Sequence, residues 1–218
     1  MALVGDRLCV DRWEASLLEV PPDGPERPWS PHLVPPAHGV NLRAVSKPDV
    51  LPQGHISGEQ ALAACVNAGK RLCTESEWVR ACRGPNDTQY PYGNQRIAGV
   101  CNDSGRAVHP VAEAARRSGL SPKRMWYEGM DDPIINQLAD TLRKTGERSR
   151  CTNGYCLYDM VGNLHEWIDD PAGTFRGGYF MDTQINGEGC SYATHAHPFS
   201  YHDYSTGFRC CRDADRAR

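Results

Sequence analysis

Two carboxylates lie close together in the segment LYDMVGNLHEW, residues 157–167, and could bind a metal ion. Asp159 and Glu166 are seven residues apart, and the turn-forming pair Gly162-Asn163 lies between them. Hard cations such as calcium take several oxygen ligands, from carboxylates and from backbone carbonyls exposed at turns. The structural alternative is that the two side chains cap a turn and pair with a nearby arginine.

The stretch between Cys190 and Cys210 is rich in side chains that could bind a metal or a polar ligand. Two histidines and a carboxylate around an open coordination position suit non-haem iron or another divalent metal. Loops rich in histidine, tyrosine and aspartate equally describe a groove that contacts a peptide or a sugar. The residues concerned are His195, His197, His202, Asp203, Tyr192, Tyr201 and Tyr204.

Ten cysteines indicate an oxidising compartment. Cytosolic proteins seldom keep so many, and the spacing here is not that of paired zinc knuckles. We therefore expect an extracytoplasmic protein, periplasmic or secreted. Residues 1–6 lack the apolar core of a signal peptide, so we expect an export signal that is absent from this sequence.

Two short helices are predicted on either side of the link 69–73. Residues 58–68 have helical spacing, and a glycine follows them. Thr74 and Glu77 form a capping box that begins the second helix. The two helices are thus expected to be joined by a short link.

The other elements are expected to be short strands and loops. Residues 7–16 alternate enough to form a strand, and the pieces LYDMV, TFRGGYF and TGFRCC after Cys151 predict short strands of a mixed sheet. The Pro-rich residues 17–56 are expected to form a loop. The polar insertion 106–150, with a helix expected at 136–143, is a candidate lid or docking element.

Composition bounds the class of protein. The chain has 218 residues, a formal net charge of −3, 21 glycines and 16 prolines, which together predict one loop-rich globular domain over 1–218. No basic run is present, so the electrostatic signature of a nucleic-acid-binding protein is missing. No apolar stretch reaches the roughly 18 residues that a membrane span needs.

Four segments resemble the formylglycine-generating enzyme family, whose domain is also called the sulfatase-modifying-factor domain. They are CVDRWEAS (9–16), GKRLCTESEWVRACRG (69–84), YDMVGNLHEW (158–167) and FRGGYF…TGFRCC (175–211), and they occur in the family's order. The resemblance implies an α+β fold, a loop-rich variant of the C-type-lectin-like fold with two helices and short mixed β-strands.

The resemblance also implies disulfides and a calcium site. By position, Cys65 pairs with Cys210 and Cys82 with Cys190. Cys101 is expected to pair with Cys151 or Cys156, whereas Cys73 and Cys211 pair with each other or with Cys9. The calcium ligands carried over are the side chains of Asp159 and Glu166 and the carbonyls of Gly162 and Leu164.

The catalytic part of the family pattern is missing. Family enzymes bind copper with two cysteines shortly after a glycine-rich strand, but here Asp182 takes the place of the first, and the second has no counterpart. Thiolates select Cu(I) and a carboxylate does not. His165 replaces a tryptophan that lines the family's groove.

Two functions remain open from the sequence. The first is a non-catalytic module that binds a peptide, protein or glycan in the former substrate groove, without nucleic-acid binding or membrane insertion. The alternative is a metal-dependent oxidoreductase, using iron or copper, with a rebuilt site. The residues of that site would be His165, Asp182, His195, His197 and His202.

Overall fold

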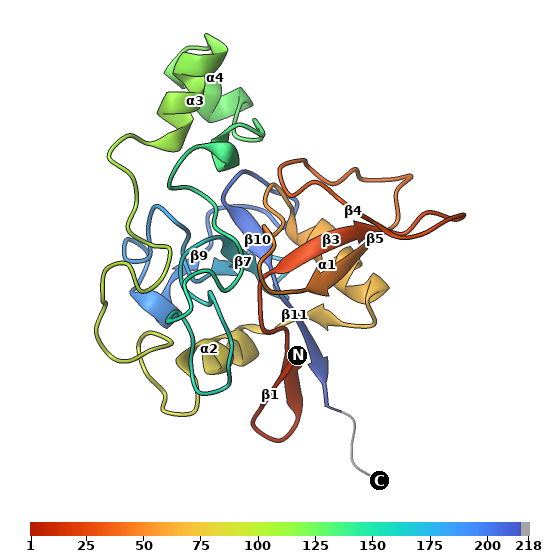
Figure 1. Ribbon diagram of the computed structural model, residues 1–218, viewed down its shortest axis with the longest axis vertical. Helices are drawn as coiled ribbons and strands as arrows, with labels where there is room; N and C mark the ends of the chain where they lie inside the picture. The colour runs from red at the N-terminus through yellow and green to blue at the C-terminus, as the bar shows by residue number, and fades with distance from the viewer. Residues whose placement is uncertain (215–218) are drawn as a thin grey trace.

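The computed structural model describes residues 1–214 as three small sheets and four α-helices joined by long loops (Figure 1). This agrees with the expected α+β class and with its low content of regular structure. The strands are short because each is bounded by turn-forming residues, and the sheets therefore depend on loop packing and disulfides for their arrangement.

The first sheet joins the two ends of the chain. Its order is β1 (Ala2–Val4), β2 (Leu8–Val10), β11 (Cys210–Asp213) and β6 (Arg71–Leu72), with all neighbours antiparallel. Because β11 pairs with both β2 and β6, the C-terminal strand lies between the N-terminal hairpin and the link that connects the two predicted helices (Figure 1).

The second sheet is the mixed sheet that the sequence predicted. Its order is β10 (Thr206–Phe208), β7 (His165–Trp167), β8 (Phe175–Arg176) and β9 (Ala193–Thr194). The β10–β7 pair is parallel and the other two pairs are antiparallel. The LYDMV piece forms no such strand: Tyr158 makes only an isolated bridge to Thr152.

The third sheet corrects two expectations about the N-terminal region. It comprises β4 (Arg27–Pro28), β3 (Ala15–Glu19) and β5 (Leu42–Ser46), so residues 17–56 contain strands as well as loops. The strand expected over 7–16 is divided between β2 and β3. Its middle leaves both sheets because Asp11 forms an ion pair with Lys70 and Glu14 turns into the interior.

Two helices form where the sequence predicted them. Helix α1 (Gly58–Asn67) begins with a Ser57–Gln60 capping box, and α2 (Glu75–Arg83) begins with the expected Thr74–Glu77 box. Each box satisfies two backbone N–H groups that the first turn leaves without helical partners. The α2 side chain of Trp78 is fully buried against the core.

The insertion contains two helices that the sequence analysis did not predict. Helices α3 (Pro110–Ser118) and α4 (Pro122–Glu128) each begin at a proline, and they project from the rest of the molecule (Figure 1). The helix expected over 136–143 is only a 3-10 turn, Ile135–Gln137. Asp140 takes a left-handed conformation, φ 57°, which ends helical structure there.

Four disulfides connect these elements. The structure contains both pairs carried over from the family, Cys65–Cys210 and Cys82–Cys190, which join α1 and α2 to the C-terminal region. Cys73–Cys211 and Cys101–Cys151 are the other two, each one of the alternatives left open by the sequence. Cys9 and Cys156 remain as free thiols.

Three clusters of buried apolar side chains make up the core. One lies around α2 and the N-terminal hairpin, and a second lies between α1 and the strands β3, β5, β7 and β8. The third attaches the insertion, because α3 and α4 contribute Ala114 and Met125 to a cluster with Phe180 and Tyr204. Within residues 1–214, no helix is long and apolar enough to cross a bilayer.

Candidate functional site

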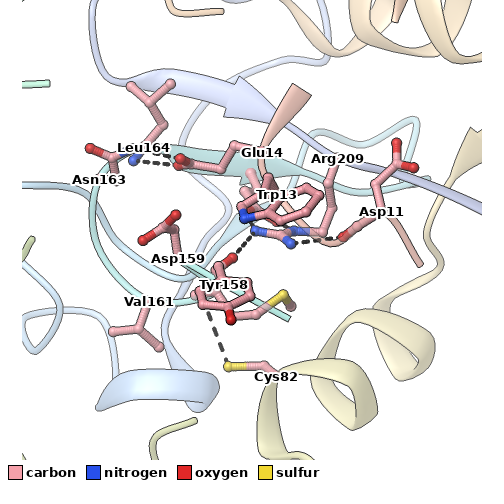
Figure 2. A network of polar contacts seen from close by, with 12 residues as sticks. Asp11, Trp13, Glu14, Cys82, Tyr158, Asp159, Val161, Asn163, Leu164 and Arg209 are labelled. Atoms are coloured by element: carbon pink, nitrogen blue, oxygen red, sulfur yellow. Dashed lines mark hydrogen bonds and ion pairs between the residues drawn. The ribbon is translucent and has the colours of Figure 1, made fainter. Parts of the chain in front are cut away.

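A buried ion pair between Arg209 and Glu166 organises the predicted calcium segment. Both side chains are almost completely buried, and the guanidinium donates two hydrogen bonds to the carboxylate, at 2.6 and 2.7 Å. Trp78 Nε1 donates a third, at 2.6 Å. Arg209 also donates to the backbone carbonyls of Asp11 and Tyr158 (Figure 2). Both oxygens of Glu166 therefore have donors from the protein itself.

Two further carboxylates lie in the same buried region (Figure 2). Glu14 is fully buried and accepts a hydrogen bond from the Leu164 N–H, at 3.1 Å. Burial, together with the negative charges of Asp159 and Glu166, raises the pKa of Glu14 well above its usual range. Asp159 accepts from the Gly146 N–H at 2.7 Å, and burial raises its pKa to about 7.

The sequence analysis missed Glu14 and Arg209 as members of this cluster. Arg209 lies 43 residues from Glu166, and Glu14 lies 150 residues from Leu164, so no local spacing could reveal these contacts. The one available signal was a glutamate inside the alternating apolar segment that precedes β3. A charged residue at such a position is rarely buried unless it has a partner.

The negative charge of the cluster favours a bound cation, but only some of its oxygen atoms are available as ligands. When all three buried carboxylates are ionised, one guanidinium balances them only in part, and a divalent ion would neutralise the excess and favour the charged forms of Glu14 and Asp159. Asp159 and the backbone of the turn at Gly162 remain candidates, whereas Arg209 and Trp78 occupy both oxygens of Glu166. Among residues 1–214, no group of three or more His, Cys, Asp or Glu side chains is arranged to hold a metal.

Gly162 itself is required by the turn. Its φ of 79° lies in the left-handed region, and a Cβ there would collide with the backbone carbonyl of Asn102. The chain can reverse at this point only with glycine, which places Asn163 and Leu164 beside Glu14.

A cavity of about 370 Å³ lies beside the mixed sheet. Eight ring-bearing residues are among the described residues that line it, and we call six of them the aromatic floor. Their rings are in contact with one another: His165 lies 4.5 Å from the ring of Phe175 and 4.7 Å from that of Tyr179, and His197 stacks on Tyr201 at 3.9 Å. The aromatic floor comprises His165, Phe175, Tyr179, Tyr192, His197 and Tyr201.

His165 is a neutral histidine at the centre of the aromatic floor. Only 5% of its surface is exposed, and burial, with a smaller effect of His197, lowers its pKa to about 3. Its Nδ1 is buried without a hydrogen-bond partner among the described residues. The family's tryptophan is thus replaced by a ring that still packs as an aromatic group but can also exchange a hydrogen bond.

One carboxylate lines the cavity. Asp203 accepts hydrogen bonds from the hydroxyl of Tyr201, at 2.6 Å, and from the N–H and hydroxyl of Ser205, both at 2.7 Å. No lysine or arginine is among the described residues that line the cavity. Arg176, which lies close by on β8, is paired with Glu75 on α2 and is not free to bind a ligand.

The insertion reaches this cavity. Trp126 and Met130, from α4 and the turn after it, are among the residues that line the cavity. The Trp126 side chain is 44% exposed, and its ring packs on that of His109, 4.8 Å away. The insertion therefore contributes to the cavity lining, and its role as a lid stays a prediction.

The five residues predicted to form a transition-metal site are only partly together. His165 and His197 line the cavity. Asp182 instead accepts hydrogen bonds from the backbone of residues 184 and 185. His195 contacts Thr174 at 2.9 Å, and His202 contacts Asp131 at 3.0 Å. Neither of these two histidines lines the cavity, so the structure does not gather the five around one point.

None of the cysteines, all of which lie within residues 1–214, lines the cavity either. The family's copper-binding position follows Gly177-Gly178, and here Tyr179 enters the cavity from that point while Asp182 lies in the next turn. Eight of the ten cysteines are in disulfides. The two free thiols are elsewhere, Cys9 on β2 and Cys156 on an exposed loop.

Comparison with known proteins agrees with this architecture. The profile of the sulfatase-modifying factor enzyme 1-like domain matches residues 28–214. The chain is 33% identical over 147 residues to the formylglycine-generating enzyme of Bos taurus, which covers 62% of this chain and 33% of that protein. It is 32% identical over 157 residues to the formylglycine-generating enzyme of Thermomonospora curvata, covering 67% and 43%.

A third relative is named as an inactive enzyme. The chain is 32% identical over 143 residues to the inactive C-alpha-formylglycine-generating enzyme 2 of Mus musculus, covering 61% of this chain and 39% of that protein. The chain spans between a third and a half of the length of these relatives. With the profile matching most of its residues, the chain belongs to the sulfatase-modifying factor enzyme 1-like family.

Proposed function

We propose that this protein is an extracytoplasmic binding module that takes a peptide segment of a partner protein into the cavity beside the mixed sheet. It does so without the copper–cysteine chemistry of the family. The observation that carries this proposal concerns the ten cysteines, all within residues 1–214. Eight are in disulfides and two are free thiols, and none of the ten lines the cavity.

Two further points support a binding role. A relative named an inactive enzyme indicates that the family's scaffold also occurs in members described as inactive. The cavity, at about 370 Å³, suits one or two amino-acid side chains of a larger ligand. The four disulfides are typical of proteins in an oxidising compartment, which supports an extracytoplasmic location.

The metal-dependent oxidoreductase has less support. Its five proposed ligands lie in at least four different surroundings, and only His165 and His197 share the cavity. A glycan ligand remains an outcome of the test below.

Selection from a random peptide library on the immobilised protein tests the proposal. We expect enriched peptides to lose binding to His197→Ala and Trp126→Ala, which truncate a half-buried and an exposed side chain of the cavity lining. Two matched controls, His195→Ala on the same loop and Tyr127→Ala on the same helix, should bind as the wild type does. No enrichment, or enriched peptides that bind all four variants equally, would overturn the proposal.

We also propose that a calcium ion stabilises the buried carboxylate cluster, with Asp159 and the carbonyls of Gly162 and Leu164 as ligands. The excess of carboxylates over Arg209 supports it. A ligand that binds only the folded state raises its stability, so calcium should raise the melting temperature of the wild type. Asp159→Asn should lose this shift, whereas Asp140→Asn, at an exposed carboxylate, should keep it. An equal shift in both variants would contradict the assignment.

A further inference from the structure

The cavity combines aromatic faces with negative charge. The rings of His165, Phe175 and Tyr179 form a continuous surface, because successive ring centroids lie 4.5–4.7 Å apart. His197 extends it, with its ring 5.8 Å from Phe175 and 3.9 Å from Tyr201. The face of an aromatic ring carries a partial negative charge that attracts cations.

The carboxylate of Asp203 also favours a cation in the cavity. Asp203 lies in the cavity wall with 5% of its surface exposed, and its hydrogen-bond donors, Tyr201 and Ser205, are neutral. Asp203 and Asp182 both act on Tyr179, whose pKa is raised by burial and by these two negative charges. The described lining contains no lysine or arginine to offset the carboxylate.

We propose that the cavity recognises an alkylated ammonium group, held over the aromatic floor and beside Asp203. This inference rests on the proposed function and names the chemical class of the group that the cavity accepts.

The contacts distinguish this class from the other candidates. A ligand carboxylate would approach Asp203 with no cation to compensate the repulsion. A sugar would use the amide and hydroxyl groups of the lining, such as Asn186 and Thr194, and would leave the charge of Asp203 without a counter-charge. An alkylated ammonium needs no hydrogen bond, because it is held by the ring faces and by the field of the carboxylate.

His165 suits the same ligand. Its imidazole is neutral at ordinary pH, so the middle of the aromatic floor adds no positive charge that would repel a cation. Trp126, from α4, also lines the cavity, and its side chain is 44% exposed. Indole has the strongest cation attraction among the aromatic side chains.

A pair of probes of nearly identical shape tests the proposal. Choline carries a trimethylammonium group, and 3,3-dimethylbutan-1-ol replaces its nitrogen by carbon and is neutral. Binding of each is measured by titration calorimetry with the intact, oxidised protein. We expect choline to bind about tenfold more tightly, the order of a desolvated cation–π contact.

Variants locate the effect in the cavity. Trp126→Ala and His197→Ala should reduce choline binding severalfold, while Tyr127→Ala and His195→Ala should leave it unchanged. Asp203→Asn should lower the ratio between the two probes, and circular dichroism reports whether this buried variant folds. If Asp203→Asn does not fold, the ratio of the two affinities in the wild type, Trp126→Ala and His197→Ala still decides.

The outcomes separate this inference from the proposed function. Equal affinity for choline and the neutral alcohol, or preference for a methyl glycoside, would overturn the cation assignment. If library peptides still bound in the cavity, the proposed function would stand. If choline bound with the expected preference but no peptide did, the cation site would stand and the proposed peptide ligand would be wrong.

Discussion

At the scale of single residues, His165 shows how this chain departs from its family. A histidine has taken the place of a groove-lining tryptophan, yet its ring contacts Phe175, Tyr179 and Tyr192 as an aromatic residue would. Because the imidazole is buried, its protonated form would lack the hydration that it has in the unfolded chain. The stability of the folded protein should therefore depend on pH.

The pKa of His165 is about 3 in the folded protein, below its usual value near 6.5. Between these values the unfolded chain binds a proton that the folded protein does not, so stability falls as the pH drops below 6.5. The slope is about 1.4 kcal/mol per pH unit from this residue. We predict that urea unfolding of His165→Leu lacks this component. His38→Leu, at an exposed histidine, should keep it, and an unchanged slope in His165→Leu would refute the assignment.

The Arg209–Glu166 pair is the second feature at this scale. Removing one partner of a buried pair leaves the other charge without compensation, which costs about 3–5 kcal/mol. We predict a loss of this size in the unfolding free energy of Arg209→Met. Arg124→Met, which breaks the exposed pair with Glu128, should have little effect. A small loss in Arg209→Met would mean that the pair does not organise the cluster.

The sequence predicted Asp159 and Glu166 as a possible pair of calcium ligands, but it did not reveal their surroundings. The structural alternative, pairing with an arginine, holds for Glu166 and not for Asp159, which bonds to a backbone N–H. Such outcomes depend on residues far away in the chain, so they cannot be read from spacing within one segment.

At the scale of elements, local signals succeeded where they were complete. The Thr74–Glu77 capping box marked the start of α2, and the glycine after residue 68 marked the end of α1. Helices α3 and α4 were missed because their signals, a proline at the first position and few apolar residues, also occur in loops. Their apolar side chains become buried only against Phe180 and Tyr204.

The insertion is closed at its base by the Cys101–Cys151 disulfide, 50 residues apart in sequence. The loop-entropy model gives about 4 kcal/mol for a loop of this length. We predict that replacing both cysteines by serine lowers the unfolding free energy by up to that amount and increases amide exchange within 106–150. Cys156→Ser, at a free thiol, is the matched control. Unchanged exchange in 106–150 would show that the packing around Met125 suffices.

At the scale of the whole molecule, the fold class was predictable because the family motifs span most of the chain. Motif order, however, does not give pairing partners: β2 and β3 belong to different sheets although only four residues separate them. The third buried cluster could not be predicted from the sequence either, because it joins an insertion to the strand region. These are long-range properties that arise only when the elements pack together.

The central claim is that the family's scaffold has kept its groove and lost its thiol chemistry. Mass spectrometry of a cysteine-containing peptide, incubated with the oxidised protein, copper(I) and oxygen, tests it most directly. The account predicts that the peptide keeps its thiol and that no aldehyde forms. Conversion of the thiol to an aldehyde, by the wild type and equally by a variant with Cys9→Ser and Cys156→Ser, would contradict it.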